Sequence, residues 1–245
     1  MTAWFSGEHG MNDMRNGTRY VIANWKCRKS FAQARAWLDT FSAEYRPTDG
    51  VEVVLAPPLI LLARVAQLLE ESGLQGVSLA AQDVSPFPRG SYTGATAADM
   101  LEGISAYAIV GHSERRRYFH ETPNDVTNKV SEAVDGGIIP IVCVDEKNAM
   151  SQLTALGDID CDTMVIAYCP VDDGSYPEPQ APAKTGEVVN YISQVYPRYP
   201  IIYGGGVNPG NVEDYLKIDG LSGVFVGSAG LEAQSFLEIV RRAQS

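Results

Sequence analysis

The chain has 245 residues, 45% of them hydrophobic and 20% charged, which is enough to bury a full core in one or two domains. Its net charge of −11 argues against nucleic-acid binding, because an acidic surface repels phosphate backbones. No stretch approaches the roughly 18 apolar residues of a membrane span, and residues 1–18 lack the apolar core of a secretory signal. We expect residues 1–18 to form a disordered leader and residues 19–245 to form one domain.

The four cysteines have neither CxxC spacing nor a metal-binding pattern, and they lie in or beside apolar segments. They are Cys27, Cys143, Cys161 and Cys169. This usage predicts reduced thiols in a cytoplasmic protein, with neither disulfides nor a metal site.

Eight short apolar runs predict strands. Most of them are rich in Val, Ile and Ala and do not alternate with polar residues, which is typical of parallel strands buried on both faces. The predicted strands are Tyr20–Ala23, Val51–Ala56, Val77–Ala81, Ala106–Val110, Ile138–Val142, Thr163–Tyr168, Pro200–Tyr203 and Gly223–Val226.

Amphipathic stretches between these runs predict helices. Ser30 is a candidate N-cap, and Pro123, Pro182 and Pro209 suit the first turn of a helix. The predicted helices are Ser30–Tyr45, Leu59–Ser72, Ala95–Gly103, Pro123–Asp135, Pro182–Val195, Pro209–Leu216 and Leu231–Arg242, with a short, weakly patterned segment at Lys147–Leu156.

Eight strand–helix alternations favour a single-domain (β/α)₈ barrel of the α/β class. A doubly wound open sheet is the alternative. That fold usually carries a GxGxxG turn after its first strand, which Ala23-Asn24-Trp25 does not supply.

In such barrels the site lies at the carboxyl ends of the strands, and polar residues gather there in this sequence. Lys26 offers a fixed positive charge for a phosphate or a developing enolate, or is simply a surface lysine. His112 stands where a helix would begin and present its ring to a pocket, or is a core histidine. Glu114 either pairs with Lys26 or stabilises the first helical turn. For Arg115–Arg117 we favour structural pairing or solvent exposure over phosphate binding.

Glycine-rich turns follow the last two predicted strands, at Gly204-Gly205-Gly206 and Gly227-Ser228. Such turns let backbone N–H groups approach a phosphate, although glycine also serves tight turns that bind nothing. Their position after both final strands favours a phosphate site.

These segments together resemble the signature segments of triosephosphate isomerase, in family order and over residues from about 20 to the C-terminus. They are Asn24-Trp25-Lys26, Gly111-His112-Ser113-Glu114-Arg115-Arg116, Ala167-Tyr168-x-Pro170-Val171, Tyr203-Gly204-Gly205-Gly206-Val207 and Val226-Gly227-Ser228-Ala229.

The resemblance implies interconversion of dihydroxyacetone phosphate and glyceraldehyde 3-phosphate through an enediolate, as in glycolysis and gluconeogenesis, without a cofactor. It implies that Asn24 and Lys26 contact substrate, that His112 is a neutral electrophile and that Glu114 pairs with the lysine. It also implies phosphate contacts from the remaining matched residues, which are Gly174, Gly205, Gly206, Gly227 and Ser228.

The match fails at the catalytic base. The family glutamate is replaced by Cys169 and the following tryptophan by Asp172, and the Gly-Thr-Gly-Lys core of the lid is absent. Smaller departures are Gly206 for a serine, Ser228 for a glycine and Ala95 for a glutamate. Three readings remain open. Cys169 is the base, although a thiol titrates near pH 8.5. A lid carboxylate (Asp172, Asp173 or Glu178) is the base. Or there is no base.

Three functions follow from these readings. The first is an isomerase acting on a small phosphorylated sugar, and the second is a binding or regulatory protein without turnover. The third is another barrel enzyme, such as an aldolase. We rank it low, because an aldolase would use a Schiff-base lysine inside a strand and no predicted strand contains a lysine. Residues 82–93 match the length of the family loop that inserts into a partner subunit, with Phe87 and Tyr92 as apolar anchors, which implies a homodimer.

Overall fold

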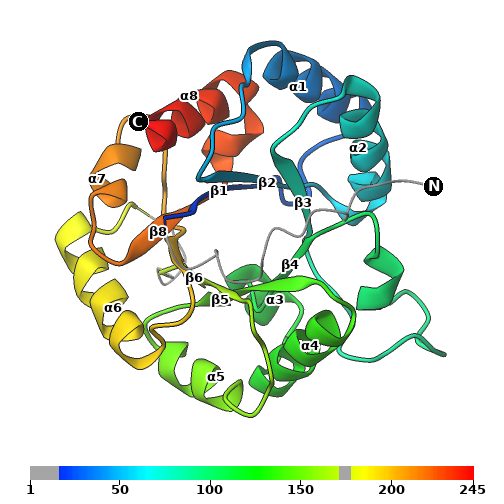
Figure 1. Cartoon of the computed structure of the whole chain (residues 1–245). Coiled ribbons are helices and arrows are strands. Elements are labelled where there is room, and N and C mark those ends of the chain that lie inside the picture. Colours follow the sequence, from blue (N-terminus) through cyan, green and yellow to red (C-terminus); the bar gives the residue numbers. More distant parts are fainter. Residues whose placement is uncertain (1–16, 171–177) are drawn as a thin grey trace.

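The computed structural model describes residues 17–170 and 178–245, which form a closed barrel of eight parallel strands (Figure 1). The strands neighbour one another in chain order, and β8 pairs with β1 to close the ring. This confirms the (β/α)₈ prediction and excludes the open sheet. The strands are β1 (Arg19–Asn24), β2 (Val51–Ala56), β3 (Val77–Ala81), β4 (Tyr107–Val110), β5 (Ile139–Val144), β6 (Val165–Tyr168), β7 (Ile201–Tyr203) and β8 (Leu221–Val226).

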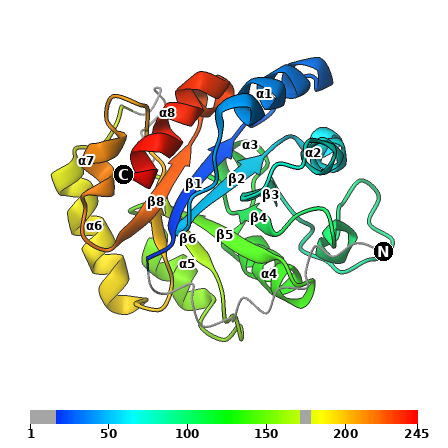
Figure 2. The same cartoon turned by 45° about the horizontal axis from the view of Figure 1, so that its top comes forward.

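The helices surround the ring of strands (Figures 1 and 2). The α-helices are α1 (Phe31–Glu44), α2 (Leu59–Ser72), α3 (Ser113–Tyr118), α4 (Pro123–Asp135), α5 (Ala149–Ala155), α6 (Pro182–Val195), α7 (Val212–Leu216) and α8 (Ala233–Gln244). Two 3₁₀ helices, η1 (Ala98–Leu101) and η2 (Ser228–Leu231), complete the described elements. None of these helices is long and apolar enough to cross a bilayer.

Two buried layers explain why the strands lack alternating polarity. In β1, Val21 and Ala23 pack in the layer between strands and helices, whereas Tyr20 and Ile22 pack in the barrel interior. All four side chains are buried. Because both faces of each strand lose water, apolar residues stabilise the fold on both.

Local capping signals place several helix starts correctly. Ser30 caps α1 through a capping box with Gln33, and Pro123 and Pro182 occupy first-turn positions of α4 and α6.

The prediction for Pro209 was wrong. The side chains of Asn208 and Asn211 hydrogen-bond to backbone groups of Gly210 and Gly206, which holds a turn there. Helix α7 therefore begins only at Val212.

The helix predicted at Ala95–Gly103 is also wrong, because only the single 3₁₀ turn η1 forms. No side chain caps its start at Ala97, and Gly103 has a left-handed φ of 72° that ends the helical path.

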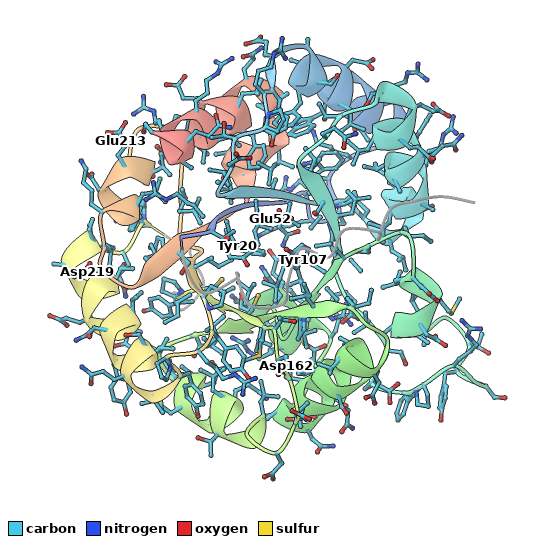
Figure 3. All side chains as sticks on the ribbon, viewed as in Figure 1. Tyr20, Glu52, Tyr107, Asp162, Glu213 and Asp219 are labelled. Carbon is cyan, nitrogen blue, oxygen red and sulfur yellow. The ribbon has the colours of Figure 1, made fainter. Side chains whose placement is uncertain are left out.

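Polar side chains fill the amino-terminal end of the barrel, where Tyr20 and Tyr107 are buried and Glu52 is partly buried. Tyr20, Glu52 and Tyr107 lie within the ring of strands (Figure 3). The Tyr107 hydroxyl lies 3.4 Å from a Glu52 carboxyl oxygen, and Ser78 also hydrogen-bonds to Glu52. Burial raises the pKa of Glu52. Since all eight strands are parallel, their carboxyl ends meet at the opposite opening.

Candidate active site

A strained turn holds Lys26 at the carboxyl end of β1. Lys26 has a left-handed φ of 51°, which is uncommon for a residue with a side chain. Its N–H donates to the buried Asn24 side chain over 2.9 Å, and its carbonyl accepts from the Gln82 amide over 3.0 Å. The turn therefore stays in this conformation, which is typical of functional positions.

The Lys26 ammonium contacts Glu114 in the first turn of α3. Its Nζ lies 2.6 Å from Glu114 Oε1, as expected from the sequence. Both side chains are partly exposed, so the pair adds little to stability. Its effect is to orient the ammonium group.

His112 is the N-cap residue of α3, and its Nδ1 accepts from the Glu114 N–H over 3.2 Å. The side chain is only 11% exposed. Burial lowers its pKa to about 4, Lys26 and Arg116 add to the lowering, and Glu114 opposes it. The ring is neutral at physiological pH. Because Nδ1 accepts, the ring proton lies on Nε2, where it can be donated to a ligand oxygen.

The arginines after Glu114 make structural pairs. Arg116 donates to the carbonyls of Gly111 and Cys143 and lies 2.6 Å from Asp145. Arg115 joins Asp83 and Glu121, the same two carboxylates that hold the buried Lys129. Arg117 stacks over Tyr118, with 5.4 Å between the guanidinium carbon and the ring centroid.

Cys169 follows β6 directly and faces the barrel interior beside Cys143 and Phe225. Its N–H donates to the Val144 carbonyl over 2.8 Å. A hydrogen bond with Cys169, together with burial, raises the pKa of the Cys143 thiol. A Cβ on Gly204 would lie 2.6 Å from Cys169 Sγ, so glycine at this turn makes room for the thiol.

The two glycine turns lie at the same opening as Lys26. A Cβ on Gly227 would be 3.8 Å from Lys26 Cε, which places the Gly227-Ser228 turn beside the lysine side chain. Ser228 begins η2. After β7, a Cβ on Gly205 would overlap the Tyr203 hydroxyl, and Gly206 has a left-handed φ of 62°. Gly174, Asp172 and Asp173 lie outside the described residues, and Glu178 is exposed.

Sequence reasoning missed how Gln180 is anchored. Its N–H donates to the Tyr203 hydroxyl over 2.9 Å, and the Tyr168 and Tyr215 hydroxyls donate to its side-chain and backbone oxygens over 3.1 and 2.7 Å. The hydroxyl groups come from β6, β7 and α7. The only signal in the sequence is that each of two neighbouring strands ends in a tyrosine. Sequence reasoning likewise assigned no role to Gln82, whose side-chain amide donates to the Lys26 carbonyl.

Comparisons with known proteins agree with this geometry. The family model described as triosephosphate isomerase matches residues 19–243. A triosephosphate isomerase from Xanthomonas euvesicatoria pv. vesicatoria is 34% identical over 92% of this chain and 98% of its own length. One from Dehalococcoides mccartyi strain BAV1 is 31% identical over 91% and 95%.

A solved triosephosphate isomerase from Bartonella henselae superposes with a TM-score of 0.77 at 26% identity, over 93% of this chain and 99% of that one. The match spans the whole barrel and both chains almost completely. This chain therefore belongs to the triosephosphate isomerase family.

Proposed function

We propose that this protein interconverts the aldose and ketose forms of a small phosphorylated sugar through an enediolate, either glyceraldehyde 3-phosphate and dihydroxyacetone phosphate or a close analogue. The relatives named above carry the name of an enzyme with this reaction. The observation that carries the proposal is the arrangement of Lys26, Glu114 and His112 at one end of the barrel.

In this proposal Lys26 and His112 stabilise the negative charge that develops on the substrate oxygens. The ammonium provides a fixed positive charge, and the neutral imidazole donates from Nε2 and can move a proton between two oxygens. Glu114 positions the lysine. Asn24 contributes to the same pocket by holding the Lys26 turn.

The phosphate is assigned to the glycine turns after β7 and β8, with Gly205, Gly206, Gly227 and Ser228 as its contacts, and Gly174 is proposed as a further substrate contact. Backbone N–H groups in such turns bind anions without a side chain in the way. The proximity of Gly227 to the Lys26 side chain supports one continuous anionic site.

The candidates for the proton-abstracting group are Cys169, Asp172, Asp173 and Glu178. Cys169 lies at the end of β6, where the family base is found. A thiol, however, offers one acceptor atom where a carboxylate offers two, and its side chain is shorter than that of glutamate. A misplacement of about 1 Å can cost roughly 100-fold in rate.

The second candidate is binding of the same ligand without turnover. The burial of Cys169 in the interior cluster beside Cys143 favours it, because a thiol packed against the core is poorly placed to take a substrate proton.

Solvent-hydrogen exchange distinguishes the two candidates. The protein is incubated in D₂O with dihydroxyacetone phosphate and, separately, with a four-carbon ketose phosphate, and deuterium beside the carbonyl is followed by NMR. We expect uptake that falls ~100-fold or more in Lys26→Ala, because a charge-stabilising group is removed. Lys217→Ala is the matched control, since this exposed lysine follows α7.

Each other outcome has a distinct meaning. Equal uptake in wild type and Lys26→Ala would come from contaminating host isomerase and contradict the isomerase proposal. Ligand-induced shifts without uptake would establish the second candidate. Neither shifts nor uptake would contradict both.

We also propose a cytoplasmic homodimer joined through residues 82–93. The segment extends away from the barrel between β3 and η1 (Figures 1 and 2). Phe87 and Tyr92 stack at 4.6 Å and remain 45% and 43% exposed, so they offer a preformed apolar contact. Light scattering after size exclusion is expected to give twice the chain mass. Phe87→Ser/Tyr92→Ser is expected to shift it toward one chain, and a monomeric wild type would contradict the proposal.

A further inference from the structure

Two cysteines from neighbouring strands meet inside the carboxyl-terminal opening of the barrel. The β5–β6 register aligns Cys143 with Ala167, so Cys169, two residues further along, faces the same side of the sheet. Both side chains belong to the buried cluster that fills the barrel interior. The hydrogen bond from the Cys169 N–H to the Val144 carbonyl ties this strand end to β5.

The two cysteines pack in the same interior cluster, and the ion pair of Arg116 with Asp145 lies beside Cys143. The neighbouring Cys169 and burial both raise the pKa of Cys143. The Arg116 guanidinium donates to the Cys143 carbonyl over 3.1 Å.

The two sulfur atoms differ in access from the opening. Cys169 is 7% exposed and Cys143 is 1% exposed, so a small oxidant that enters the opening meets Cys169 first. Gly204 has no side chain to cover this sulfur. Cys143 lies behind it, as a resolving thiol would.

We propose that Cys143 and Cys169 form a reversible disulfide on contact with hydrogen peroxide or a low-molecular-weight disulfide. With peroxide, the Cys169 sulfur attacks one oxygen, the O–O bond breaks, and the thiol proton goes to the leaving oxygen, so that a sulfenic acid and one water form. The Cys143 sulfur then attacks the Cys169 sulfur, the S–O bond breaks, and a second water leaves. Two thiols lose two electrons and two protons, and one peroxide becomes two waters.

Closing this bond requires a small backbone movement. Neighbouring parallel strands lie about 4.8 Å apart and two residues span about 6.6 Å along a strand, so these two Cα atoms are about 8 Å apart, whereas disulfide-bonded cysteines rarely exceed about 6.8 Å. The end of β6 therefore moves about 1 Å toward β5. Cys169 lies beyond the last residue of β6, where such a shift disturbs few ladder hydrogen bonds. A strained disulfide is readily reduced, so the modification is reversible.

Thiol mapping of the full chain tests the proposal without any sugar phosphate, so its result is independent of the proposed function. In a Cys27→Ser/Cys161→Ser background the only thiols are Cys143 and Cys169. Serine at 161 can keep the hydrogen bond to the Thr163 carbonyl. After mild peroxide or oxidised glutathione, denatured protein is expected to lose both thiols. Mass spectrometry is expected to find the two cysteine peptides cross-linked within one chain, and dithiothreitol to restore both thiols.

Thiol mapping of two further proteins tests the disulfide. The same background with Cys143→Ala should give no internal cross-link and should accumulate a sulfenic acid or a mixed disulfide at Cys169. Wild-type protein, mapped without any substitution, should give the same Cys143–Cys169 peptide pair. Recovery of both as unlinked thiols under conditions that oxidise the exposed Cys27 would overturn the proposal and leave them as core packing residues.

Discussion

His112 is kept neutral by its surroundings. Burial lowers its pKa to about 4, from an ordinary value of 6.5. The unfolded chain therefore takes up a proton at a higher pH than the folded one, so the contribution of His112 to stability is present above pH 6.5 and is lost as the pH falls through about 4.

We expect side-chain NMR of His112 to report a neutral Nε2–H tautomer from pH 5.5 to 8, with a midpoint near pH 4. His112→Asn identifies the resonances. A midpoint at 6 or above would contradict the buried, Nδ1-accepting geometry and would make the residue a cation at the pH of the exchange experiment.

At the scale of elements, a buried charge network joins the end of β3 to α3 and α4. Lys129 of α4 lies 2.6 Å from Asp83 and also contacts Glu121, and the Lys129 and Glu121 side chains are almost fully buried. Burial raises the pKa of Asp83, against the effect of Lys129 and Arg115. The Lys129 cation therefore offsets part of the cost of burying Asp83.

We expect Lys129→Met to destabilise the protein by roughly 3–5 kcal/mol, because it leaves the buried Glu121 and the partly buried Asp83 short of a cationic partner. Urea unfolding at pH 7 measures the change. Lys217→Met at an exposed position should cost less than about 0.5 kcal/mol. If both substitutions lower the free energy of unfolding equally, the contacts of Lys129 with Asp83 and Glu121 do not stabilise the fold.

At the scale of the whole molecule, the two ends of the barrel differ. The carboxyl-terminal opening carries the charged groups and glycine turns, whereas the amino-terminal end encloses Tyr20, Glu52 and Tyr107 (Figure 3). Burial raises the pKa of Glu52, so its contribution to stability is full below its ordinary value of 4.5 and is lost as the pH rises.

Glu52→Gln keeps an acceptor for Tyr107 and removes the titration. We expect the variant to gain stability relative to wild type between pH 5 and pH 8, as measured by the difference in urea midpoints at the two pH values. If the difference in urea midpoint between the variant and the wild type does not change with pH, the pKa of Glu52 is not raised in the folded protein.

Much of this fold could be predicted from the chain alone. All eight strands were located to within about two residues at their ends, because runs buried on both faces are continuous in the sequence. The segments around Lys26 and His112 stood out because polar residues follow apolar strands. The stretch at residues 95–103 and the turn at Pro209 failed, because side-chain hydrogen bonds and glycine conformation prevailed over periodicity.

The eight strand–helix alternations and the polar residues after the strands could be read from the chain, since both depend on local pattern and chain order. The folded structure alone shows that Cys143 packs in one cluster with Cys169, that Lys129 pairs with two carboxylates, and that three tyrosine hydroxyls converge on Gln180. Such contacts join residues far apart in the chain. They depend on strand register and on the closure of the ring, which no local pattern encodes.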